Sequence, residues 1–238
     1  MRLHRSRGRA QAGATLLEGP HLVGAAIDAG HRLGTVFATF GDAVGTELAR
    51  RGGAELLAVD DRTLQRLGTT EAPQSPIAVM AVPTDQPPPG GRVIVAWGLA
   101  DPGNCGTLIR IAAAFGYGFL SGPGSAELWS PKVLRAAAGA HFTLRLGRVD
   151  TLEAVRAGGR TIVATVARGG MAPGTLPASV AILVGNEAHG LAAEIVSAAD
   201  MRVTIPTSGA VESLNAAVAG AIVAYLGVAG PGTNLYAS

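Results

Sequence analysis

The sequence predicts an α/β protein with a mostly parallel sheet, and three observations carry this prediction. Short apolar runs rich in β-branched residues, such as residues 93–97 and 180–184, alternate with segments of helical pattern. Of the 238 residues, 48% are hydrophobic and only 15% are charged, which excludes intrinsic disorder. Three prolines and two glycines within residues 84–91 predict a linker. We therefore expect one domain over residues 1–83 and a second over residues 92–238.

The part before the linker is expected to be a small α/β sandwich. A proline near the start favours a helix over residues 20–29, and Gly52-Gly53 is typical of a helix end after residues 43–50. Asp60 and Asp61 open a further helix toward Leu67. Apolar runs predict strands over residues 33–39 and 77–82.

The part after the linker alternates more regularly. Apolar runs predict strands over residues 93–97, 117–120, 161–166, 180–184 and 202–205. Helices are predicted over residues 106–115, 131–138, 191–198 and 214–226, the second with Ser130 as N-cap and Pro131 at its first position. Buried strands alternating with helices imply a parallel sheet covered on both sides, with ligands at the carboxyl ends of the strands.

Charge alone does not identify a function, because the formal net charge is only +2. The basic residues are eighteen arginines and a single lysine, Lys132, a bias that a GC-rich coding sequence would also produce. Residues 132–168 carry seven basic and two acidic residues. Such a stretch is either a solvated face or a footprint for a polyanion.

Targeting and redox signals point to the cytoplasm. The only cysteine, Cys105, excludes an intramolecular disulfide framework and a multi-cysteine zinc site. The arginine-rich N-terminus is not followed by the apolar run of a signal peptide. Residues 213–238 are uncharged, but their apolar part is short for a membrane span and fits a buried core helix better.

The first unusual strand-exit segment is residues 101–110. Asn104 and Gly106 suit a tight turn, and the amides that open the following helix favour an anion. Arg110 lies about one turn into an otherwise apolar helix and needs a partner there. The residues alone leave open whether that partner is a carboxylate of the fold or a substrate.

The second segment is residues 182–191, where an apolar strand leads into Gly185, Asn186 and Glu187. Gly185 permits close approach of a backbone or a ligand. Glu187 can accept hydrogen bonds or pair with Arg110. His189 is expected to be exposed or capping rather than a general base.

The third segment is residues 203–215. Ser213 is a plausible N-cap for the last helix. Asn215, early in an alanine-rich helix, is poorly explained by helix propensity and suits fixing a ligand or a neighbouring loop.

Several other chemistries lack their sequence signals. G-x-G-x-x-G, the phosphate-loop motif, H-E-x-x-H and G-x-S-x-G are absent, and the five histidines do not cluster at metal-ligand spacing. Cys105, near a helix start, suits a small buried filler better than a nucleophile. No metal site is expected.

Taken together, the three segments resemble the SpoU (TrmH) branch of the SPOUT RNA methyltransferases. The first resembles the family's N-x-G-x-x-x-R motif, the second its G-N-E-x-x-G-L motif, and the third its I-P-x-x-G-x-x-x-S-L-N motif. Residues 130–139 also look like family sequence, and the resemblance covers about residues 90–228. Residues 17–23 resemble the start of the small substrate-binding domain, similar to ribosomal RNA-binding proteins, that precedes the catalytic domain in many members.

The resemblance implies a deep trefoil knot, a homodimer formed by the C-terminal domain, and S-adenosylmethionine as cofactor. The implied reaction is methyl transfer to a ribose 2′-hydroxyl of RNA. By residue match, the catalytic set is Arg110, Asn104, Glu187, Ser213 and Asn215. The implied cofactor-binding set is Gly185, Asn186, Ile205 and Leu214.

The expected RNA is ribosomal RNA first and transfer RNA second, bound without a membrane or a metal. The arginine-rich N-terminus and residues 132–168 are expected to contribute to RNA binding. A non-catalytic RNA-binding or ribosome-assembly protein on the same fold remains the alternative, as does another nucleotide-using enzyme of this sheet class.

Overall fold

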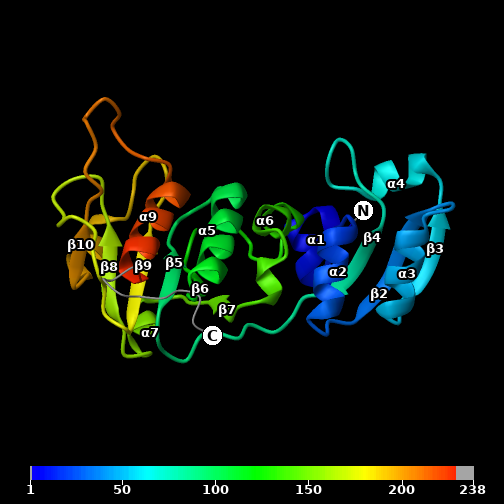
Figure 1. Cartoon of the computed structure of the whole chain (residues 1–238), viewed down its shortest axis with the longest axis horizontal. Coiled ribbons are helices and arrows are strands. Elements are labelled where there is room, and N and C mark those ends of the chain that lie inside the picture. The colour runs from blue at the N-terminus through cyan, green and yellow to red at the C-terminus, as the bar shows by residue number, and fades with distance from the viewer. Residues whose placement is uncertain (1, 229–238) are drawn as a thin grey trace. The chain divides into compact units, whose positions relative to one another are not determined.

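The structure, a computed structural model, describes residues 2–228 and divides them into two compact units. The first unit runs up to Thr84 and also includes Glu127–Thr143, and the second comprises Asp85–Ala126 and the chain from Leu144 onward. The predicted linker over residues 84–91 belongs mostly to the second unit, which begins at Asp85, and residues 127–143, which were predicted in the second domain, belong to the first unit. Figure 1 labels the elements of both units.

The first unit contains a four-stranded sheet in the order β1-β4-β2-β3. β2 pairs with β3 in parallel and with β4 antiparallel, and β1 pairs antiparallel with β4. The strands are β1 (Ala14–Glu18), β2 (Leu33–Thr39), β3 (Glu55–Val59) and β4 (Ile77–Ala81). The helical elements are η1 (Arg2–His4), α1 (Ser6–Ala12), α2 (Pro20–Asp28), α3 (Ala43–Arg51), α4 (Asp61–Leu67), α6 (Pro131–Ala137) and η2 (Ala140–Phe142).

Local sequence explains the helix starts of this unit. The carboxylates of Asp42 and Asp60 accept hydrogen bonds from the amides three residues later, and the Ser130 hydroxyl does the same. The pattern did not predict η1, α1, β1 or β3. α1 carries glycine and arginine without an apolar period, and β3 is an exposed edge strand without a buried face.

The second unit contains a six-stranded sheet in the order β10-β8-β9-β5-β6-β7, in which every pair is parallel. The strands are β5 (Val93–Ala96), β6 (Gly118–Ser121), β7 (Leu146–Arg148), β8 (Thr161–Thr165), β9 (Val180–Val184) and β10 (Met201–Val203). The helices are α5 (Pro102–Ala114), α7 (Leu152–Arg156), α8 (Ala193–Ala198) and α9 (Ala216–Val228). The parallel sheet confirms the predicted fold class.

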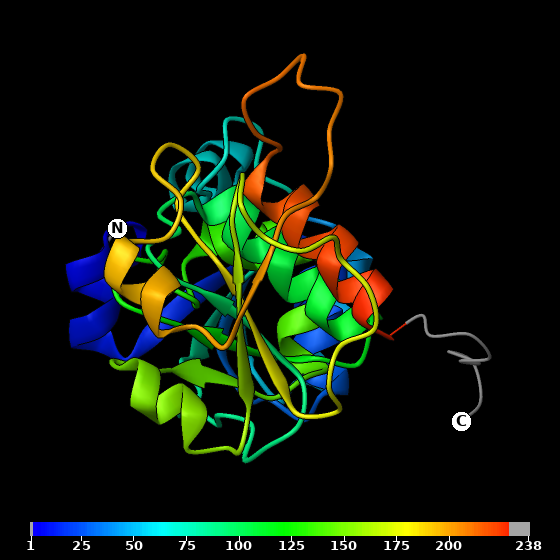
Figure 2. The same ribbon diagram turned by 90° about the vertical axis from the view of Figure 1, so that its left-hand side faces the viewer.

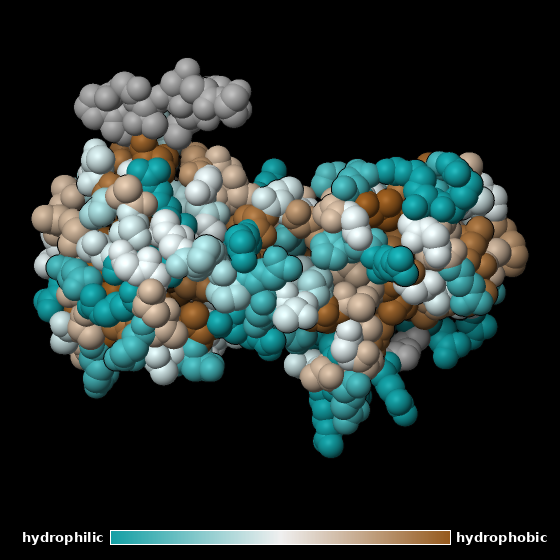
Figure 3. All heavy atoms as spheres, turned by 90° about the horizontal axis from the view of Figure 1, so that it is seen from below, coloured by the Kyte–Doolittle hydropathy of each residue, from teal (hydrophilic) through white to brown (hydrophobic). Residues whose placement is uncertain are grey.

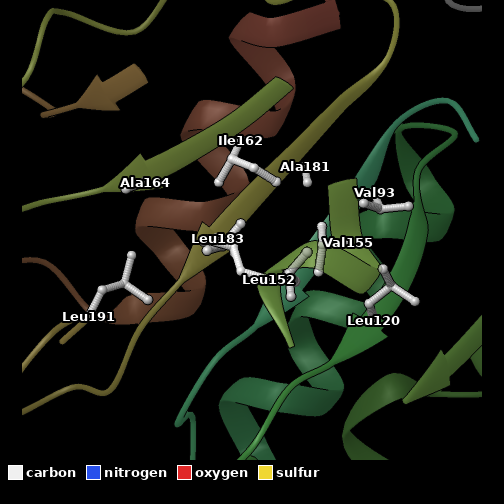
Figure 4. Packing of buried hydrophobic residues seen from close by; sticks show 10 residues of the cluster. Val93, Leu120, Leu152, Val155, Ile162, Ala164, Ala181, Leu183 and Leu191 are labelled. Carbon is white, nitrogen blue, oxygen red and sulfur yellow. The ribbon is translucent and has the colours of Figure 1, made fainter. Parts of the chain in front are cut away.

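Helices cover both faces of this sheet (Figure 2). On one face, side chains from β5, β8 and β9 meet Leu152 and Val155 of α7, and Ile195 of α8 packs against the same cluster (Figure 4). On the other, α5 and α9 pack together, and α9 also contacts β9. Gly220 of α9 permits this, because a Cβ there would lie 2.6 Å from Leu108 Cδ2.

The helices α5 and α9, which flank the site, begin at other residues than predicted. α5 begins at Pro102 instead of Gly106, because Asp101 caps it by accepting from the Asn104 amide at 2.7 Å, so the expected turn at Asn104 and Gly106 is helix. α9 begins at Ala216, and its cap is Asn215 rather than Ser213. The Oδ1 of Asn215 accepts from the amides of Ala217 at 3.0 Å and Val218 at 3.1 Å.

Four of the seven basic side chains in residues 132–168 form ion pairs or hydrogen bonds within the fold. Arg148 pairs with Asp85 at 2.7 Å and Arg156 with Asp200 at 2.7 Å, while Arg135 lies 3.9 Å from Glu18. Arg160 is buried and donates to three backbone carbonyls, those of Pro88, Gly91 and Val155. The solvated-face reading therefore fits this stretch better than an extended polyanion footprint.

The surface of the molecule is mixed in character. Hydrophilic side chains cover much of the face shown in Figure 3, and several stand out into solvent. None of the helices within residues 2–228 has the length and apolar character needed to cross a bilayer.

Candidate functional site

A cavity of about 430 Å³ lies at the carboxyl ends of β8, β9 and β10. This is the sheet edge at which parallel α/β folds bind ligands. Three loop segments and α9 enclose it. The loop segments are the exit of β8, the residues 185–191 after β9, and the residues 205–214 that connect β10 to α9, and α9 contributes Ala216, Ala219 and Val223. Gly185, Asn186, Glu187, Ile205, Ser213 and Leu214 all line it.

The turn after β9 is fixed by its own backbone. The amide of Asn186 donates to the Gly190 carbonyl at 3.1 Å, and the amide of Gly190 donates to the Asn186 carbonyl at 2.9 Å. The Oδ1 of Asn186 accepts from the amides of Ala188 and His189. A Cβ on Gly185 would lie 2.5 Å from the Gly190 carbonyl carbon, so the close approach that this glycine permits is to the protein's own chain.

Three side chains from distant segments join at one side of this site. The Nδ2 of Asn104 donates to Oε1 of Glu187 at 2.6 Å, and the Nδ2 of Asn215 donates to Oδ1 of Asn104 at 3.0 Å. Asn104 comes from the first turn of α5, Glu187 from the turn after β9, and Asn215 caps α9. The relay of these three residues (the Asn104–Glu187–Asn215 relay) therefore holds the three predicted segments in one arrangement.

Arg110 stands apart from the relay. It is exposed on α5 and does not line the cavity, and within residues 2–228 its side chain forms no hydrogen bond or ion pair. Of the two partners that the sequence left open for Arg110, a carboxylate of its own fold, Glu187 included, is not found within residues 2–228. Its neighbours on the exposed face of α5 are Thr107 and Ala114, one turn before and one turn after it.

The cavity is acidic. Its ionisable lining residues are Glu187, Glu212 and His189, and neither lysine nor arginine is among them. Because a positively charged ligand is favoured in such surroundings, the cavity suits a cation better than an anion.

Cys105 follows Asn104 of the relay in the chain, and its thiol is expected to be unreactive. Its side chain is fully buried in α5. Burial, with a smaller contribution from the charge of Asp101, raises the pKa of the thiol to about 12. A thiolate nucleophile is therefore excluded at neutral pH, in agreement with the filler interpretation.

Sequence reasoning missed several lining residues, including Thr165, Thr207 and Glu212. Thr165 ends an ordinary strand, and its hydroxyl donates to the Leu183 carbonyl at 2.8 Å. Glu212 is adjacent to Ser213 in the third motif, so its place in that motif was the available signal.

Comparison with known proteins adds the family. The sequence model of the SpoU rRNA Methylase family matches residues 91–225, and that of the MRM3-like substrate binding domain matches residues 1–78. The 23S rRNA (guanosine(2553)-2′-O)-methyltransferase RlmP of Bacillus subtilis is 30% identical over 230 residues, covering 94% of this chain and 92% of its own.

A second relative is the 23S rRNA (uridine(2479)-2′-O)-methyltransferase of Streptomyces viridochromogenes, 32% identical over 200 residues, or 75% of this chain and 69% of its own. Among solved structures, the SpoU methyltransferase AviRb of that organism, in complex with AdoMet, has a TM-score of 0.83 at 27% identity, over 95% of this chain and 93% of its own. A putative TrmH-family RNA methyltransferase of Porphyromonas gingivalis has a TM-score of 0.82 at 30% identity, over 94% and 93%.

Proposed function

Because this chain belongs to the SpoU rRNA methylase family, we propose that it transfers a methyl group from S-adenosylmethionine to a ribose 2′-hydroxyl of ribosomal RNA. The observation that carries the proposal is the Asn104–Glu187–Asn215 relay beside the acidic cavity. It unites the three family motifs at one ligand-sized site.

The cavity fits the cofactor in size and charge. A volume of about 430 Å³ is in the range of small-molecule sites. Glu187 and Glu212 without an opposing cation suit a sulfonium. Gly185, Asn186, Ile205 and Leu214 line the cavity, and we propose that they hold the cofactor largely through their backbones.

S-adenosylmethionine supplies an activated methyl group with a good leaving group, so the protein mainly has to align the acceptor and help remove its proton. We propose that Arg110 binds the phosphate next to the target ribose. Because a protonated guanidinium is a poor base by itself, Arg110 acts together with that phosphate as the 2′-hydroxyl loses its proton. Glu187, held by Asn104, orients the substrate, while Ser213 and Asn215 fix the loop beside it.

We further propose a homodimer in which Arg110 serves the partner's cavity. Two features of the C-terminal unit support it. Arg110 does not line the cavity of its own protomer. On the neighbouring α9, Val218 is 49% exposed and Tyr225 is 47% exposed, although the helix carries no charge. These apolar residues and the exposed face of α5 would form the interface.

The chain path around α9 supports a knot. Met171 lies in the connection between β8 and β9. Its amide donates to the Arg202 carbonyl and its carbonyl accepts from the Thr204 amide, each at 2.9 Å. The Leu176 amide of the same connection donates to the Gly227 carbonyl at 3.4 Å. This connection thus touches both ends of the segment that runs from β10 through α9. We propose that the segment from β10 through α9 passes through the connection between β8 and β9. Such a knot would hold the loops around the cavity in place and restrict their motion.

For the whole protein we propose that residues 1–83 select the RNA and residues 92–238 carry the catalytic site. The match to a substrate binding domain over residues 1–78 supports the first assignment. The reaction is expected in the cytoplasm, where ribosomal RNA is available.

The test is methyl transfer from labelled S-adenosylmethionine to RNA from cells that lack the gene. We expect label in 23S ribosomal RNA, recovered as an alkali-resistant dinucleotide, and its loss in Arg110→Ala. Arg202→Ala is the control, since Arg202 is also an exposed arginine of the same unit and lies outside residues 132–168. Label in Arg110→Ala at the wild-type rate, with the cofactor bound, would refute the role of Arg110. Absence of label from wild type would refute ribosomal RNA methylation.

A further inference from the structure

Residues 2–12, which comprise η1 and α1, form an ordered segment (the arm) instead of an extended tail. η1 and α1 lie in contact with each other, and the Nη1 of Arg9 in α1 donates to the Leu3 carbonyl of η1 at 2.9 Å. The Arg5 amide closes η1 by donating to the Arg2 carbonyl at 3.2 Å, and the Arg9 amide opens α1 by donating to the Arg5 carbonyl at 3.0 Å. Gly8 makes this possible, because a Cβ at that position would collide with the Arg2 carbonyl. The direction of the arm is therefore set by its own backbone.

A buried arginine, Arg9, holds the arm against the rest of the first unit. Arg9 is only 6% exposed, and its Nε and Nη2 donate to the two oxygens of Glu127 at 2.8 Å and 2.5 Å. Its Nη1 also donates to the Leu3 carbonyl at 2.9 Å. A bidentate pair of this kind fixes orientation as well as distance.

Contacts with α4 complete the docking. Leu3 packs against the cluster formed by Leu16, Leu64 and Ile77. The ring of His4 hydrogen-bonds through Nε2 to the Leu67 carbonyl at 2.9 Å, at the end of α4. Arg66 of α4, which is exposed, precedes that residue in the chain.

The arm presents basic side chains that the fold does not use. Arg2, Arg5 and Arg7 are exposed, and within residues 2–228 their side chains form no hydrogen bond or ion pair. No aspartate or glutamate occurs before Glu18. On α4, Asp61 lies in the first turn, at the other end from Leu67. The exposed Glu71 follows the helix, and its carbonyl accepts a hydrogen bond from Gln65. Arg50 and Arg51 of α3, by contrast, are paired with Glu47 and Asp28.

We propose that Arg2, Arg5, Arg7 and Arg66, the arm patch, bind phosphate groups of the RNA substrate. This inference rests on the proposed function, because it assumes an RNA substrate. Arginine suits phosphate through its planar fork of donors, and contacts to the sugar-phosphate backbone position a protein without reading sequence. Since the arm is already docked, less conformational entropy is lost on binding than for a flexible tail.

The main test compares two double variants that remove the same charge. RNA binding to an in vitro transcript of 23S ribosomal RNA is measured by fluorescence anisotropy between about 0.05 and 0.3 M salt. For Arg5→Ala/Arg7→Ala we expect Kd to rise about tenfold and the slope of log K against log salt to fall by about one to two. Arg50→Ala/Arg51→Ala should change neither, and both variants should keep the wild-type Tm and cofactor affinity.

Two results would overturn the arm patch. One is unchanged RNA affinity in Arg5→Ala/Arg7→Ala, and the other is an equal loss in both double variants, which would indicate general charge. A wild-type protein that neither binds nor methylates the transcript would instead contradict the proposed function.

A separate variant tests the docking of the arm. Gly8→Ala keeps every arginine but displaces the arm, so we expect weaker RNA binding with unchanged cofactor affinity. Full RNA affinity in Gly8→Ala would show that a flexible arm binds equally well, and would refute the contribution of docking.

Discussion

The Nδ2 of Asn215 donates to the Oδ1 of Asn104 at 3.0 Å, across 111 positions of sequence, while its own Oδ1 caps α9. A single amide thus performs two tasks. Its oxygen satisfies the first free amides of the last helix, and its nitrogen links that helix to α5 and, through Asn104, to Glu187. The start of α9 is thereby tied to the geometry of the cavity.

Asn215→Asp separates these two tasks. Aspartate keeps the capping oxygen but lacks the Nδ2 donor, so we expect Tm to stay near wild type while kcat falls about tenfold or more. Asn215→Ala loses both tasks and should in addition lose about 1 kcal/mol of stability. Thermal unfolding and single-turnover methyl transfer measure the two effects, and full activity in Asn215→Asp would exclude a positioning role for its amide nitrogen.

Gly185→Ala tests the tight turn at the cavity. The added methyl would lie 2.5 Å from the Gly190 carbonyl carbon and 2.6 Å from the Leu191 amide nitrogen, both of which are backbone atoms. We expect a destabilisation of about 1–3 kcal/mol and a marked loss of cofactor affinity by calorimetry. Gly174→Ala is the matched control, because a Cβ at Gly174 meets no atom within 4 Å. Equal behaviour of the two variants would refute this account of the turn.

His141 should make the stability of the protein depend on pH. Burial lowers its pKa from 6.5 to about 4, although the hydrogen bond to the Leu128 carbonyl opposes this. Between pH 6.5 and about 4, His141 is protonated in the unfolded chain but stays neutral in the folded protein. The stabilisation is therefore complete above pH 6.5 and falls by about 3 kcal/mol toward pH 4.

Denaturant unfolding at several pH values measures this dependence. His141→Gln keeps a donor for the Leu128 carbonyl but does not titrate, so its stability should vary less between pH 6.5 and 4. His189→Gln, at an exposed position, should retain the wild-type slope. An unchanged slope in His141→Gln would assign the pH dependence to other groups.

Cys105 should resist alkylation in the folded protein. It is fully buried with a pKa of about 12, so iodoacetamide at pH 8 should label it only after unfolding. Cys105→Ala should retain methyl transfer, with a modest loss of stability from the cavity it leaves. Rapid labelling of the native protein, measured by mass spectrometry, would show that α5 opens readily.

The buried strands could be predicted from sequence because their signal is local. β5, β8 and β9 are short apolar runs, and their bounds match the predicted ranges to within one residue. The helix starts of α5 and α9 were less predictable. Asp101, Ser213 and Asn215 are all acceptable caps by residue type, and the tertiary contacts select among them.

By itself, the sequence determined the fold class, the family and the three segments that form the site, because apolar periodicity and motif order are written along the chain. Only the tertiary structure decided which side chains meet. The relay joins Asn104 to Glu187 and Asn215. Arg110 is left exposed, and the arginines of residues 132–168 are mostly taken up by ion pairs and carbonyls. The physical reason is that a hydrogen bond depends on positions a few ångströms apart in space, which local sequence patterns do not specify.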